Sequence, residues 1–229
     1  RSFDVETETN EVRALRGKFE RLVEIHQEKG SSECLYAFGQ PDEDCNFQQY
    51  LTRSSVPAEP KDYSEKEWEK MRSSYVRALL TRGLGVYSES GINPLQLGII
   101  SSTDNHAATG GFVEEDEWLG SVFGIGDLDR AMVRKSWNPG GLVAVWAEQN
   151  TRHSIFDALK RREVYATSGP RIQLRLQGSK NTLTCDAHDS DGVPMGGSFK
   201  NLRKAPQFRI QAMYDEIPLQ SIEIIKGEF

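Results

Sequence analysis

Two side chains of metal-ligand type, Asp104 and His106, follow a short apolar run near the middle of the chain. In an extended segment, residues two apart point to the same side, so a carboxylate oxygen and an imidazole nitrogen would meet at one point. That pair suits a Zn, Mn or Fe ion. The alternative is that Asp104 accepts backbone hydrogen bonds in a turn while His106 is an ordinary surface residue, because a D-x-H spacing is short and common.

His26 is the third candidate ligand. It ends a short apolar–polar alternation that is typical of a strand, and it forms with Glu24 another pair of ligand-type residues two positions apart. The remaining histidines are weaker candidates. His153 lies on the first turn of a predicted helix and His188 in an acidic loop, where isolated polar side chains are mostly solvated.

The elements that would position these residues alternate between strands and helices. Apolar or alternating runs predict strands at 23–26, 97–100 and 142–147, and helical spacing predicts helices at 11–22, from Ser64 to Gly83, at 128–135 and at 152–162. We take Asn10 as the N-cap of the first helix, Ser64 and Glu67 as a capping box, and Gly83 as a C-cap. This rhythm favours an α/β body with a parallel sheet over residues 1–170, with its sites at the carboxyl ends of strands.

From about residue 171 the helical periodicity is lost. Strand-like runs at 171–176, 207–213 and 221–225 are separated by Gly, Pro and Asp turns. Residues 171–229 are therefore predicted to form a small all-β module that stops directly after a strand.

Composition narrows the function classes. The 229 residues are 37% hydrophobic and 27% charged, with a net charge of −6, which indicates a globular protein and argues against nucleic-acid binding. No apolar run reaches the ~18–20 residues that span a bilayer. The chain has no GxSxG, HExxH or Walker A motif.

Three cysteines allow at most one disulfide. Cys34 and Cys45 flank a loop and could pair in an oxidising compartment such as the periplasm or the cell exterior, or they could be ordinary thiols. The localisation and the oligomeric state stay open.

Four stretches of the chain resemble an uncharacterised domain-of-unknown-function family that is allied to the PHP (polymerase and histidinol phosphatase) hydrolases. They are 24–34, 100–106, 138–148 and 150–169, of which 156–169 is the most specific, and the resemblance runs from about residue 11 to the end. Members of that family are longer, so the chain resembles their carboxy-terminal portion. PHP enzymes open with an H-x-H pair, which does not occur in this sequence.

The resemblance implies a fold, a cofactor and a reaction. The fold would be part of a PHP-like distorted β/α barrel, followed by the β module. Asp104 and His106 match the late D-x-H ligands of the family, and His26 matches its mid-barrel histidine. The cofactor would be a cluster of divalent metal ions, Zn, Mn or Fe, which activates water to hydrolyse phosphate esters. Several ligands would lie outside this chain, so activity of the fragment alone stays open.

Four further residues are candidates for roles around the metal. Glu33 and Glu148 are expected to assist catalysis, and Thr103 and Arg152 to contact a small anionic or ester substrate. The alternative is that Glu33 and Glu148 are solvated loop carboxylates.

Two readings of function follow from these residues. The first is a portion of a metal-dependent, phosphoesterase-like hydrolase. The alternative is a non-catalytic ligand-binding or interaction module on a degenerate hydrolase scaffold. The metal content of the purified chain separates them.

Overall fold

The computed structural model describes residues 4–35, 45, 47–48, 64–114, 117–118, 138–183, 192–199 and 204–227. The helix predicted at 128–135 lies outside these residues. Within the described part of the chain, none of the helices combines the length and apolar character that a membrane crossing requires.

The first helix, α1 (Asn10–Phe19), is capped one residue earlier than predicted. The Thr9 side chain accepts a hydrogen bond from the backbone N–H of Val12, and the carboxylate of Glu11 lies in the first turn. Both features stabilise a helix start, because the first backbone N–H groups have no partner within the helix and the amino end of the dipole favours negative charge.

The predicted helix from Ser64 to Gly83 is two helices. The capping box of Ser64 and Glu67 is confirmed at the start of α2 (Glu65–Arg72), and after a turn α3 (Val76–Ser90) begins. Gly83 lies in the middle of α3. Its missing side chain allows close packing, because a Cβ there would lie 2.8 Å from the Cβ of Leu95.

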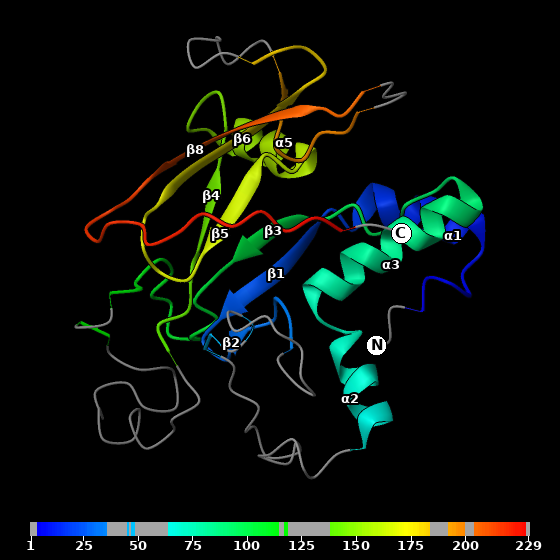
Figure 1. Ribbon diagram of the computed structural model, residues 1–229. Coiled ribbons are helices and arrows are strands. Elements are labelled where there is room, and N and C mark those ends of the chain that lie inside the picture. Colours follow the sequence, from blue (N-terminus) through cyan, green and yellow to red (C-terminus); the bar gives the residue numbers. More distant parts are fainter. Residues whose placement is uncertain are drawn as a thin grey trace.

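The first sheet has the order β2-β1-β3, formed by β1 (Leu22–Gln27), β2 (Gly30–Ser31) and β3 (Gly98–Ser101). β1 and β3 are parallel, whereas β2 turns back antiparallel to β1. Figure 1 shows α3 beside this sheet. The buried cluster lies between α3 and the approach to β3, and it consists of Val5, Leu79, Val86 and Leu95 with Leu97 packed against them.

A two-stranded antiparallel sheet follows, made of β4 (Leu142–Val145) and β5 (Val164–Thr167). Between them lies α5 (Arg152–Arg161), whose N-cap is Thr151 and whose last turn is basic, as predicted from the sequence. The strand β5 is an element that periodicity did not predict. It is as short as β3 and β4, but its sequence, Val-Tyr-Ala-Thr, lacks the continuous apolar run that indicated β4.

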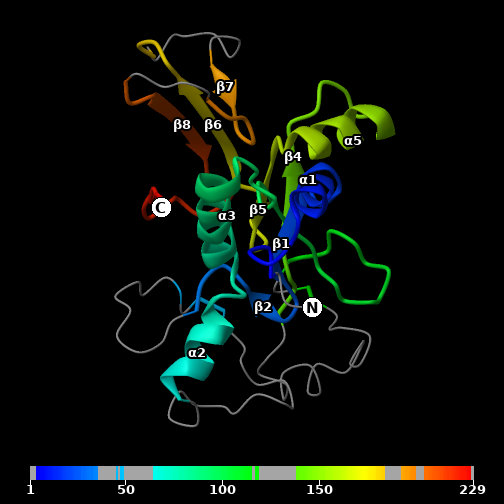
Figure 2. The same ribbon diagram turned by 90° about the vertical axis from the view of Figure 1, so that its right-hand side faces the viewer.

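The last sheet has the order β7-β6-β8 and is antiparallel. Its strands are β6 (Gln173–Ser179), β7 (Val193–Pro194) and β8 (Gln207–Met213), and it lies at the opposite end of the molecule from α2 (Figure 2). β6 and β8 correspond to two predicted strands. The third, at 221–225, is wrong, since that segment forms no ladder and its isoleucines are exposed.

The predicted fold class, a partial PHP-like β/α barrel followed by an all-β module, is wrong. The described residues form three small separate sheets and four helices, and no barrel closes. β4 runs antiparallel to its partner instead of continuing a parallel series. The alternation of strands and helices predicted a parallel sheet, and the resemblance to PHP hydrolases implied the barrel. Apolar runs predict that strands exist, but not their direction, and here β4 and β5 pair antiparallel. The domain boundary near residue 170 stays a prediction.

A disulfide joins Cys34 and Cys45, whose Cα atoms lie 5.2 Å apart. It holds Cys45 next to the end of the β1–β2 hairpin. The backbone N–H of Ser31 also donates to the carbonyl of Gln48, at 3.0 Å.

Candidate metal site

The candidate site lies where the parallel strands β1 and β3 end. The ends of the two strands and the residues that follow them are held together by three hydrogen bonds. Glu28 N–H donates to the Thr103 carbonyl at 3.1 Å, and the His26 carbonyl accepts from the N–H of Ser102 and from the hydroxyl of Ser101. Because both strands point the same way, these bonds bring side chains 75 residues or more apart in sequence to one edge of the sheet.

The segment 138–141 closes the site from a third direction. Asn138 N–H donates to the Glu28 carbonyl, and Gly141 N–H to the Ser102 carbonyl. Gly140 has φ +85°, and a Cβ there would lie 2.6 Å from the Cα of Thr103. Only glycine allows the chain to pass this close in that conformation.

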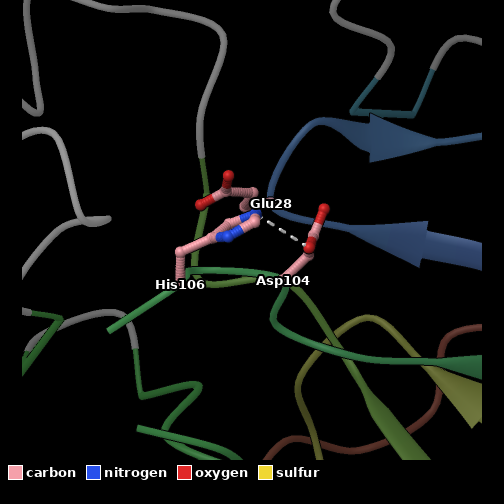
Figure 3. A group of neighbouring side chains, drawn as sticks. All are labelled: Glu28, Asp104 and His106. Atoms are coloured by element: carbon pink, nitrogen blue, oxygen red, sulfur yellow. Dashed lines mark ion pairs between the residues drawn. The ribbon is translucent and has the colours of Figure 1, made fainter. Parts of the chain in front are cut away.

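Three ligand-type side chains meet at this edge: Glu28, Asp104 and His106 (Figure 3). One ligand atom from each lies within 4.8 Å of the others. His106 Nε2 is 3.2 Å from Asp104 Oδ1. Glu28 is only 2% exposed, whereas the side chains of Asp104 and His106 are 40% and 63% exposed, so the group opens to solvent on one side.

The D-x-H pair converges through a different backbone conformation from the extended one that we predicted. Asp104, His106 and Ala108 have φ of +51°, +56° and +55°. Left-handed conformations cost non-glycine residues about 1–3 kcal/mol each and gather at functional sites. The buried Asn105 holds this turn, since its side chain accepts from the N–H of Ala107 and donates to the hydroxyl of Thr109.

The donor set is suited to a divalent cation. Ligand atoms around an ion with bonds of ~2.0–2.2 Å lie roughly 3–4 Å apart, and the distance of 3.2 Å between His106 and Asp104 falls in that range. Two carboxylates and one imidazole are typical ligands of Zn, Mn and Fe. The two carboxylate charges would balance a divalent ion.

His26 is not part of this group. It is 4% exposed, its ring stacks on Phe47 with centroids 6.5 Å apart, and it lines a cavity of 510 Å³ together with Ile99 and Tyr165. Burial lowers the pKa of His26, and the hydrogen bond with Asn138 and the charge of Glu24 oppose this shift only in part. The imidazole therefore favours its neutral form.

Glu33 lines the cavity together with His26, and Thr103 directly precedes Asp104. The carboxylate of Glu33 pairs with the Arg77 guanidinium at 2.7 Å. Thr103 is buried, and its backbone carbonyl takes part in the site by accepting from Glu28.

Glu148 and Arg152 lie away from the group of three. β4 starts beside Ser102, at the end of the sheet where the site lies, and runs away from it, so Glu148 and the start of α5 follow the far end of that strand. Both residues are exposed.

Reasoning from the sequence missed Glu28 and Gln27. Gln27 is the last residue of β1 and Glu28 follows it, so the rule that pointed to Asp104 also applies to them. Glu28 also stands two residues after His26, at the same spacing as the pair of Glu24 and His26.

Comparison with known proteins identifies one family. No curated protein and no solved structure matches the chain. The family model described as "Protein of unknown function (DUF3604)" matches residues 2–229. The chain therefore belongs to the DUF3604 family.

Proposed function

We propose that Glu28, Asp104 and His106 bind a divalent metal ion and that the site hydrolyses a small anionic substrate of the phosphate-ester class. The observation that supports this most directly is the convergence of three ligand-type side chains from two strand ends. The resemblance to PHP hydrolases supports the choice of reaction.

When bound, a divalent ion supplies Lewis acidity, which lowers the pKa of water toward ~7 and polarises the bond to be broken. The chain supplies the positioning. Glu28 is fixed by burial and by two backbone hydrogen bonds, and Asp104 and His106 by the left-handed turn. The exposed side of Asp104 and His106 is where a substrate would approach.

Metal binding is tested with the purified chain by isothermal titration with Zn²⁺ and Mn²⁺ after EDTA treatment. We expect saturable binding, weakened at least about ten-fold by Asp104→Asn or His106→Ala, because each removes a ligand.

The exposed pair His153 and Asp157 on α5 gives a matched control. Its Nε2–Oδ2 distance is 3.3 Å, almost that of His106 and Asp104, but it has no third ligand in the described part of the chain. His153→Ala and Asp157→Asn should leave metal binding unchanged. Absence of binding by the unmodified chain at millimolar metal would refute the proposed site.

Hydrolysis needs its own test, with p-nitrophenyl phosphate and bis-p-nitrophenyl phosphate as probes. We expect metal-dependent release of nitrophenol that Asp104→Asn abolishes.

The second candidate function is a ligand-binding module without turnover. The cavity of 510 Å³ beside the site supports it, since the lining is largely apolar and its volume is that of a small-molecule pocket. Metal binding without hydrolysis of either probe would favour this reading.

A further inference from the structure

Gln27 lies behind the proposed metal site and is 7% exposed. Its side-chain Nε2 donates to Asp104 Oδ2 at 2.6 Å and to Glu24 Oε2 at 3.3 Å. Its Oε1 accepts from the backbone N–H of Lys29 at 3.2 Å. The amide thus contacts two carboxylates and the backbone of its own hairpin.

The orientation of this amide is chemically determined. The Lys29 N–H can only donate, so the carbonyl oxygen of Gln27 must face it, and the NH₂ group must face the carboxylates of Asp104 and Glu24. The reversed amide would set an oxygen against two carboxylates and a donor against a donor.

The two oxygens of the Asp104 carboxylate have different partners. Oδ2 is held by Gln27, and Oδ1 faces His106 Nε2 at 3.2 Å. Asp104 is partly exposed, and without this bond its side chain could rotate so that neither oxygen faced His106. Groups that hydrogen bond to metal ligands orient them, and their loss typically costs 10–100-fold in metal affinity.

Glu24 anchors the other side of the amide. Its second oxygen accepts from the hydroxyl of Ser102, which follows β3. The chain Ser102–Glu24–Gln27–Asp104 therefore links the ends of both parallel strands behind the ligand.

We propose that Gln27 is the positioning residue of the metal site, which orients Asp104 so that one oxygen is presented to the ion. This inference rests on the proposed function, because it requires that the site bind metal.

The first test is Mn²⁺ affinity, by isothermal titration, of Gln27→Met, which keeps the size and removes the donor. We expect binding at least about ten-fold weaker than in the unmodified chain. Gln173→Met makes the same change at an exposed position of β6 and should leave the affinity unchanged. Circular dichroism melting of the metal-free variants checks that they fold.

Gln27→Glu separates positioning from charge. If the site only accumulates negative charge, another carboxylate would tighten Mn²⁺ binding. If Gln27 acts by donating to Asp104, the new carboxylate repels Asp104 and binding weakens.

A double-mutant cycle identifies the residue through which Gln27 acts. In an Asp104→Asn background, Gln27→Met should cost much less affinity than it does alone, whereas a general structural role would cost the same in both.

The outcomes for the two proposals are distinct. If the unmodified chain binds no metal, the proposed function fails, and this inference with it. If it binds and Gln27→Met binds equally well, or Gln27→Glu binds more tightly, only the role of Gln27 is refuted.

Discussion

At the scale of single residues, the buried imidazole of His26 makes stability depend on pH. Burial lowers the pKa of His26 below its usual 6.5 in the folded chain. The unfolded chain therefore binds this proton more readily, and the stabilising effect, present above pH ~6.5, is lost as the pH falls toward the folded pKa.

We predict that His26→Gln flattens the pH dependence of the unfolding free energy between pH 8 and 5.5. The native slope includes up to ~1.4 kcal/mol per pH unit from this one group. Urea unfolding in EDTA measures it, and His153→Gln, at an exposed histidine, is the control that should keep the native slope. Equal slopes for the native chain and His26→Gln would contradict the prediction.

At the scale of elements, the sequence predicts local structure well where a side chain itself defines the boundary. The Ser64 capping box and the basic end of α5 are examples, since both depend on residues within a few positions. Gly83 shows the limit. A glycine after a periodic run indicates a helix end, but here its role is set by Leu95, which the chain brings close only in the folded state.

The candidate site was likewise predictable from the sequence only in its local part. Asp104 and His106 follow a recognisable strand, but Glu28 joins them only because β1 and β3 are parallel neighbours. That pairing joins segments about 75 residues apart in the sequence, and the periodicity of each segment does not reveal it. The parallel sheet expected through β4 failed for the same reason, because β4 pairs antiparallel with β5.

Three glycines in connections between elements should lose stability to different extents when each is changed to alanine. Gly110→Ala should be neutral, because a Cβ meets nothing within 4 Å, and Gly91→Ala, at φ +73°, should cost about 1 kcal/mol for the left-handed backbone alone. Gly140→Ala should cost more than ~2 kcal/mol, because φ is also left-handed, at +85°, and the added Cβ would lie 2.6 Å from the Cα of Thr103 and 2.7 Å from the carbonyl oxygen of Ser102.

Chemical unfolding gives the order of the three variants. A loss at Gly140 no larger than that at Gly91 would mean that the segment 138–141 can move away from the site at little cost.

At the scale of the whole molecule, Arg162 links the last sheet to the segment before β3. The buried guanidinium of Arg162 donates to the Gly196 carbonyl, next to β7, and to the Gln96 carbonyl, before β3, at 3.0 and 3.1 Å. The same two segments are also joined by a hydrogen bond from Gln96 Nε2 to Ser198 Oγ, at 3.1 Å.

We predict that Arg162→Met lowers the unfolding free energy by about 2–4 kcal/mol, because carbonyl groups in the partly buried joint lose their donors. Arg161→Met is the matched control. Its exposed guanidinium pairs with Glu163, two residues along the chain, and such surface pairs contribute ~0–1 kcal/mol. A similar loss in both variants, measured by urea unfolding, would show that Arg162 does not join the two parts.

The disulfide of Cys34 and Cys45 has a consequence beyond the ~3 kcal/mol that closing a loop of this length contributes. Cys45 stands two residues before Phe47, the ring that covers His26 and forms part of the cavity wall. Reducing agents break such bonds, and oxidising surroundings preserve them. The disulfide therefore restrains one face of the cavity as long as it is oxidised. Its reduction would let Phe47 move more freely, so the cavity would hold a ligand less tightly under reducing than under oxidising conditions.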